Sequence, residues 1–79
     1  PQTTFSYDLP VRTTVTLTIH DLLGREVAVL MNAVKDAGRH TMDWEAGNLA
    51  SGVYLCRLRA ENPTGSGPFT AIQKVLLLR

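Results

Sequence analysis

The sequence has a single cysteine, Cys56, and lacks any long run of apolar residues. One cysteine excludes an internal disulfide bond and a zinc site built from cysteine pairs. The longest apolar run, residues 75–78, falls far short of the roughly 18 residues that a membrane-spanning helix needs. Because no signal-peptide pattern opens the chain either, we expect no membrane insertion.

An excess of charge of one sign is also missing. Eight basic and seven acidic residues leave a formal net charge of +1. This balance provides neither the basic footprint of a nucleic-acid-binding protein nor an acidic tail, so we expect no nucleic-acid partner. The 79 residues, 44% of them hydrophobic, suffice for one small core, and residues 1–79 are expected to form a single domain.

What the sequence does contain is alternation of apolar and polar residues, clearest in residues 52–59 after the turn signal Ser51-Gly52. Tyr54, Cys56 and Leu58 fall on one face of this stretch, and Val53, Leu55, Arg57 and Arg59 fall on the other. A strand that is apolar on one face and mixed on the other is typical of a central strand over a core.

Five further segments show strand character: residues 4–9, 14–20, 26–31, 39–44 and about 69–79. Residues 32–38 look like a polar connection. Asp21 and Gly24 predict a tight hairpin turn next to a bulge, with positive φ at Gly24, and Gly52 is expected to be similar. The pattern predicts an all-β fold, an immunoglobulin-like antiparallel β-sandwich of about six to seven strands without helix.

The phases of these strands also predict the core, where we expect Val15, Leu17, Trp44 and Tyr54 to meet. Cys56 shares their inward phase and is expected to be a buried, inert thiol. His40, in phase with Met42 and Trp44, is expected to be hydrogen-bonded at the core edge, whereas His20 faces outward and is expected to be solvated.

The sequence shows no arrangement for catalysis. No G-x-S-x-G turn places a serine nucleophile, and the histidines and aspartates lack a recognisable metal-ligand spacing. Asp43 and Glu45 share an outward face, which is the normal place for solvated charges. We therefore expect no catalytic, metal-binding or cofactor-binding residues, and no enzyme.

The last strand departs from the alternation, since Val75, Leu76, Leu77 and Leu78 follow one another. Either both of its faces are covered, or Leu76 and Leu78 form an exposed apolar strip. Monomers rarely leave such a strip unused.

Several short motifs, in order, resemble a known family. The chain reads Thr3-Thr4 and Phe5-Ser6-Tyr7-Asp8-Leu9-Pro10, then Asp21-Leu22-Leu23-Gly24-Arg25-Glu26-Val27, Gly38-Arg39-His40 with Trp44, Leu49-Ala50-Ser51-Gly52-Val53-Tyr54, and Lys74-Val75-Leu76-Leu77-Leu78-Arg79. Together they resemble the type A C-terminal sorting domain of the type IX (Por) secretion system of Bacteroidetes-type bacteria. They are also similar to the immunoglobulin-like domain of the flagellar hook-capping protein. The loop at residues 62–68 is longer than is usual in the sorting family, and the upstream Asn-Pro stretch of that family is absent.

This resemblance implies a non-catalytic sorting signal behind an N-terminal cargo domain. The translocon would carry the cargo through the outer membrane, and a sortase-like peptidase would commonly remove the signal, leaving a secreted or cell-surface protein. The resemblance points to Lys74, Val75, Leu76, Leu77, Leu78 and Arg79 as the recognition element, and to Gly24, Gly38, Trp44, Gly52 and Tyr54 as structural positions. The alternatives are a structural spacer or assembly module, as in the hook-capping protein, and a carbohydrate-binding module. A carbohydrate-binding module would need exposed aromatics, and Phe69 is the one aromatic without a clear inward phase.

Overall fold

A computed structural model describes residues 2–61 and 67–78, and the described residues form six strands and no helix. The strands are β1 (Gln2–Leu9), β2 (Thr13–His20), β3 (Glu26–Lys35), β4 (Gly38–Glu45), β5 (Gly52–Ala60) and β6 (Phe69–Leu77). The prediction of an all-β fold is confirmed.

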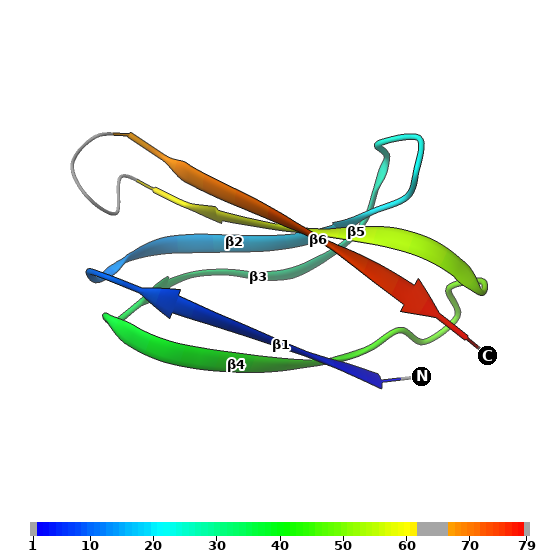
Figure 1. The fold of residues 1–79 in the computed structure, drawn as a ribbon, viewed down its shortest axis with the longest axis horizontal. Coiled ribbons are helices and arrows are strands. Elements are labelled where there is room, and N and C mark those ends of the chain that lie inside the picture. Colours follow the sequence, from blue (N-terminus) through cyan, green and yellow to red (C-terminus); the bar gives the residue numbers. More distant parts are fainter. Residues whose placement is uncertain (1, 62–66, 79) are drawn as a thin grey trace.

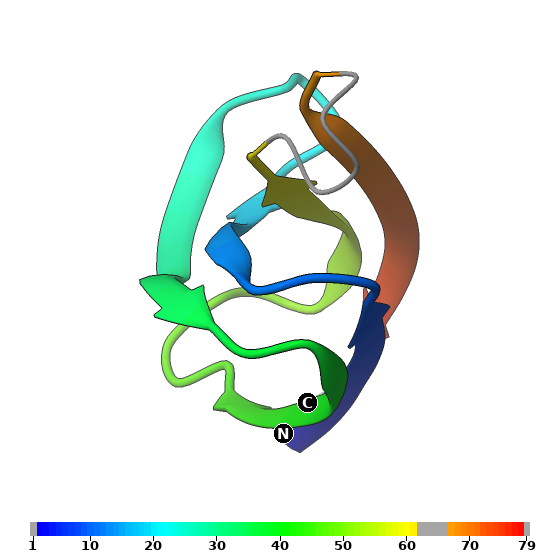
Figure 2. The same ribbon diagram turned by 90° about the vertical axis from the view of Figure 1, so that its left-hand side faces the viewer.

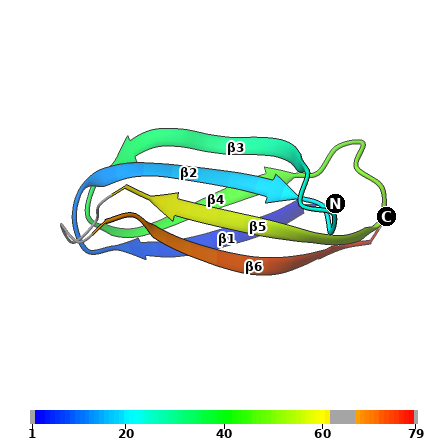
Figure 3. The ribbon, with the colours of Figure 1, turned by 90° about the horizontal axis from the view of Figure 1, so that it is seen from above.

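The strands form two antiparallel sheets that pack face to face (Figure 1, Figure 2). The large sheet has the order β3-β2-β5-β6, and the small sheet consists of β1 and β4 alone. Figure 3 shows the four strands of the large sheet side by side, with the small sheet behind them. Since β5 lies between β2 and β6, its expected central position is confirmed.

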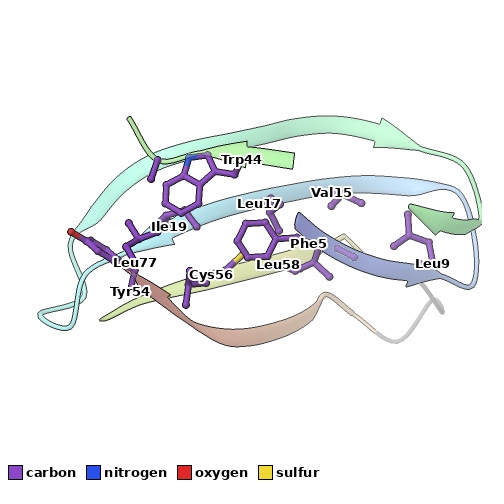
Figure 4. Close-up of a cluster of buried hydrophobic side chains, with 13 residues drawn as sticks. Phe5, Leu9, Val15, Leu17, Ile19, Trp44, Tyr54, Cys56, Leu58 and Leu77 are labelled. Carbon is purple, nitrogen blue, oxygen red and sulfur yellow. The ribbon is translucent and has the colours of Figure 1, made fainter. Parts of the chain in front are cut away.

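The core lies between the two sheets and consists of the inward faces of both (Figure 4). Alternate residues of β2 and β5 point into it, so Leu17 stands opposite Leu58 and Ile19 opposite Cys56. The small sheet contributes Trp44 and Phe5, whose rings stack with their centroids 6.3 Å apart. All four residues predicted to meet in the core are buried there: Val15, Leu17, Trp44 and Tyr54.

The turn between β2 and β3 has the geometry that the sequence predicts. The Asp21 carboxylate accepts hydrogen bonds from the backbone N–H groups of Leu23 and Arg25, at 3.0 and 2.9 Å. Gly24 follows with a φ of 86°, in the left-handed region that favours glycine. The β2–β3 register shifts between Ile19 and His20, as expected for a bulge next to the turn. Gly52 likewise has a positive φ, 156°.

The prediction that residues 32–38 form a polar connection is wrong. Backbone pairing continues to the end of β3, with Asn32 opposite Thr16 and Lys35 opposite Thr13, so that only Asp36 and Ala37 separate β3 from β4. The physical reason is that β3 is an edge strand of the large sheet. An edge strand keeps its ladder with one neighbour without needing apolar side chains on both faces.

Candidate recognition surface

Strand β6 is an edge strand that pairs with β5 along its whole length. Leu77 stands opposite Gly52 and Val75 opposite Tyr54, so the Ser-Gly-Val-Tyr motif is the direct neighbour of the final apolar run. The Tyr54 hydroxyl donates a hydrogen bond of 2.7 Å to the backbone carbonyl of Ala50. Gly52 and Tyr54 therefore hold the strand against which residues 75–77 are placed.

The final apolar run is divided between two faces. Val75 and Leu77 are 5% and 1% exposed, whereas Leu76 and Leu78 are 60% and 72% exposed. Of the two readings that the sequence leaves open, the exposed strip is therefore the one that the fold adopts. Lys74, before the strip, is exposed as well, and Arg79 lies outside the described residues.

The other family-motif positions do not gather at this surface. Gly24 lies in the β2–β3 turn, and Gly38 begins β4 with a φ of 123°, so the length of β3 separates the two. Trp44 is in the core, 8% exposed. That these three residues have a structural role stays a prediction.

On the outer face of the large sheet, the structure brings together residues that the sequence alone does not link to one another. Ile72 on β6 stands opposite Arg57 on β5 and is 64% exposed. Together with Leu55, His20 and Gly24 these two residues line a shallow depression of about 210 Å³. The alternation in the sequence places Leu55 and Arg57 on the outward face. It does not show which residues of β6 stand opposite them, because the loop at residues 62–68 separates the two strands in the sequence.

A second hollow, of about 190 Å³, lies between the small sheet and β6. Phe5 and Tyr7 of β1 form one side, Ala71 and Gln73 of β6 form the other, and Leu58 and Cys56 are part of the lining. Figure 3 shows β1 and β6 as neighbours without a shared ladder. The hollow exists because a two-stranded sheet covers only part of a four-stranded one.

The cysteine in this lining is not a reactive group. Cys56 is 4% exposed, and burial raises the pKa of its thiol from 9.0 to about 11. At neutral pH the side chain is therefore almost entirely in the thiol form, which is a poor nucleophile. The prediction that Cys56 is buried is confirmed.

The two histidines are both held by hydrogen bonds. The ring of His40 stacks on Tyr7, with centroids 5.3 Å apart, and its Nε2 lies 2.7 Å from the Asp36 carbonyl oxygen, as expected for a bonded residue at the core edge. The expectation that His20 is merely solvated is wrong. Its Nε2 lies 2.9 Å from the hydroxyl of Thr18, two residues earlier in β2, and its Nδ1 lies 3.4 Å from the carbonyl oxygen of Gly24 in the turn.

The acidic residues are engaged in the fold or exposed to solvent. Asp43 accepts a hydrogen bond of 2.7 Å from the Thr4 hydroxyl. Desolvation by itself would raise the pKa of Asp21, but hydrogen bonds from Arg25 and Leu23 and the charge of Arg25 prevail and lower it below 3.8. Within residues 2–61 and 67–78, no three His, Cys, Asp or Glu side chains gather closely enough to hold a metal ion. The same residues contain no helix of the length and apolarity needed to cross a bilayer.

Comparison with known protein families matches residues 2–68 to the secretion system C-terminal sorting domain. No curated protein and no solved structure matches the chain. Domains of this family are the C-terminal signals by which the type IX machinery exports larger cargo proteins through the outer membrane, to the cell surface or the medium. They are in general non-catalytic. The match spans most of the 79 residues, β1 to β5 included, and on this evidence the chain belongs to the family of secretion system C-terminal sorting domains.

Proposed function

We propose that residues 74–79 are the element of this sorting domain that the export machinery recognises. The observation that carries the proposal is the exposure of Leu76 and Leu78 beside the buried Val75 and Leu77. The family match stops at residue 68, so the proposal rests on the physical character of β6 and on the sequence of its end.

Two properties of this segment suit recognition. First, β6 is an edge strand with β5 on one side only, and such an edge can accept a further strand through main-chain hydrogen bonds. Second, covering two leucines would contribute roughly 3–6 kcal/mol before the cost of association. The apolar strip would then supply affinity, and the strand edge would supply register.

The proposal includes partners and the extent of the domain. The translocon of the type IX system binds the segment, and a sortase-like peptidase then removes the domain from its N-terminal cargo. Residues 1–79 act as one immunoglobulin-like, non-catalytic unit, comparable to the domain of the hook-capping protein. What supports the absence of catalysis is the burial of Cys56 and the engagement of both histidines in the fold.

The test fuses residues 1–79 to the C-terminus of a fluorescent reporter in a bacterium with an active type IX system. Leu76→Ser with Leu78→Ser should leave the domain folded, because both side chains are exposed, while the reporter accumulates in the periplasm. The matched control is Val11→Ser with Val34→Ser, which removes two valines that are 43% and 53% exposed and lie outside β5, β6 and the β2–β3 turn. This control should be exported like the parent.

Export of the Leu76/Leu78 double variant at the parental level would contradict the proposal and favour a structural-module role. Circular dichroism of the purified variants establishes that the domain is folded in each case. Mass spectrometry of the exported reporter tests the peptidase step, since removal leaves the reporter without the 79 residues of the domain.

A further inference from the structure

The outer face of β5 and β6 combines exposed aliphatic side chains with cations. Going along the two strands, Val53 stands opposite Leu76, Leu55 opposite Lys74, and Arg57 opposite Ile72. Arg57 and Lys74 therefore each have an aliphatic side chain directly across from them, and they are diagonal neighbours of one another. Diagonal neighbours on one face of a sheet lie about 7–8 Å apart.

Three cations lie on this face, and two of them, Arg57 and Lys74, have no anion beside them among the described residues. Among the described residues, neither Arg57 nor Lys74 takes part in an ion pair. The acidic residues that are near this face in the sequence either bind another arginine or lie at the edge of the face. Asp21 binds Arg25 at 2.7 Å and Glu61 binds Arg59 at 2.9 Å, while Glu26 lies on β3, across from His20.

The face is also hollowed at its centre. The depression of about 210 Å³ is bounded by Ile72 and Arg57 on one side and by the β2–β3 turn on the other, with Leu55 and His20 between them. The contact between His20 and the Gly24 carbonyl, and the three hydrogen bonds that Asp21 accepts, hold the turn in place. A hollow with one wall made by a braced turn is preformed, and a partner side chain can enter it without reordering the chain.

We propose that this outer face docks an acidic segment of a partner protein, which places an apolar side chain in the depression beside Ile72 and carboxylates against Arg57 and Lys74. Charge complementarity selects this occupant, because the face presents two unpaired cations around an apolar centre. A membrane surface fits less well, since recognition of anionic lipids relies on clusters of about four to eight basic residues. The inference rests on the proposed function, as Lys74 and Leu76 belong to both surfaces, and it extends recognition from the end of β6 to β5.

The test uses the same reporter fusion with changes outside residues 74–79. Arg57→Glu reverses one cation, and Ile72→Ser removes the exposed aliphatic wall of the depression. Arg57→Glu should lower the exported fraction by roughly tenfold or more, because like charges across an interface are strongly unfavourable. Ile72→Ser should have an effect of similar size, because it removes the apolar surface that the partner side chain would cover. Matched controls are Arg39→Glu, at a 70% exposed side chain on the small sheet, and Val34→Ser, at a 53% exposed valine on β3. Both controls should stay within about twofold of the parent, as is usual for exposed positions. The ion pair that Arg39 forms with Asp8, at 3.8 Å, is itself exposed, and such pairs contribute little to stability.

Folding is followed in the purified 79-residue variants by the emission of Trp44, the single tryptophan, and by thermal melting. If Arg57→Glu or Ile72→Ser melts well below the parent, the milder Arg57→Gln and Ile72→Thr take its place in the export assay. Folded variants that are exported like the parent overturn the proposal.

The outcomes separate this inference from the function on which it rests. If the Leu76/Leu78 double variant blocks export while folded Arg57→Glu and Ile72→Ser do not, residues 74–79 are the signal and the wider docking face is refuted. If Arg57→Glu and Ile72→Ser block export while the double variant does not, the docking face stands and the role of residues 76 and 78 fails. Binding of the parent domain to phosphatidylglycerol vesicles at physiological salt, lost in Arg57→Glu without an effect on export, would identify a lipid surface and refute the protein partner.

Discussion

Single residues in this domain have different roles, and Gly24 is needed for one specific reason. A Cβ built at Gly24 would meet no atom within 4 Å, so space does not demand glycine there. The φ of 86° does, because a side chain at positive φ clashes with its own backbone. The requirement at this position is therefore conformational.

A substitution series at Gly24 tests this reasoning. Gly24→Asn should be the mildest change, Gly24→Ala intermediate, and Gly24→Val the worst, at about 1–2 kcal/mol or more, since β-branched residues tolerate positive φ least. Chemical denaturation of the three variants measures the order. Equal losses from asparagine and valine would mean that the turn changes its conformation to accept any residue.

Trp44, in contrast, stabilises the fold through the residues that its side chain contacts. Its side chain is 8% exposed and stacks on Phe5. Trp44→Ala should cost roughly 3–5 kcal/mol through the cavity it leaves. A small domain is stabilised by only about 5–15 kcal/mol in total. Much of the Trp44→Ala population should therefore be unfolded near 37 °C.

Thermal melting followed by far-UV circular dichroism measures the Trp44→Ala effect, since the variant has no tryptophan left to report by fluorescence. Phe69→Ala is the control, because that ring is 52% exposed and its loss should cost about 1 kcal/mol or less. Similar melting temperatures for Trp44→Ala and the parent would refute the role of Trp44 in the core.

At the scale of the strands, the sequence predicts those parts in which the side-chain pattern and the backbone pairing agree. In β2, three apolar residues alternate with threonines and all three are buried, and the faces of β5 are as predicted. The pattern failed at the end of β3, because residues 32–35 show no alternation of apolar and polar side chains although their backbone pairs with β2. Strands pair through backbone hydrogen bonds, so the side-chain composition of a segment does not by itself reveal the pairing.

For a related reason, the sequence predicted only part of the candidate recognition surface. The run from Val75 to Leu78 breaks the alternation seen in the other strands, and continuing the period of two through it assigns its two faces correctly. That Ile72 faces Arg57 follows only from the register of β5 and β6. Register across a long loop depends on packing that no local pattern records.

Strand β6 offers a matched pair of substitutions that tests its division into two faces. Leu77 and Leu76 are neighbours of the same type, at 1% and 60% exposed. Leu77→Ala should cost about 2–5 kcal/mol, as buried leucines do, whereas Leu76→Ala should stay within about 0.5 kcal/mol. Urea denaturation of both variants gives the comparison, and equal losses would show that Leu76 is covered in solution.

At the scale of the whole molecule, the two sheets are unequal. β2 and β5 each have two hydrogen-bonded neighbours, whereas β1 and β4 pair only with each other. The small sheet is tied to the large one mainly by side chains such as Phe5, Leu9 and Trp44. This asymmetry leaves the hollow between β1 and β6, and it makes the small sheet the natural place for local opening.

Amide hydrogen exchange should reveal this difference directly. The hydrogen-bonded amides of β2 and β5 are expected to exchange only through global unfolding, because both of their neighbouring strands must separate first. Those of β1 and β4 should exchange about tenfold or more faster, through an opening that detaches the small sheet while the large one persists. The large sheet carries the whole proposed docking face, so this opening would leave the face intact. Equal protection of all four strands would show instead that the side-chain contacts across the core make the sandwich a single cooperative unit, in which the docking face cannot persist without the small sheet.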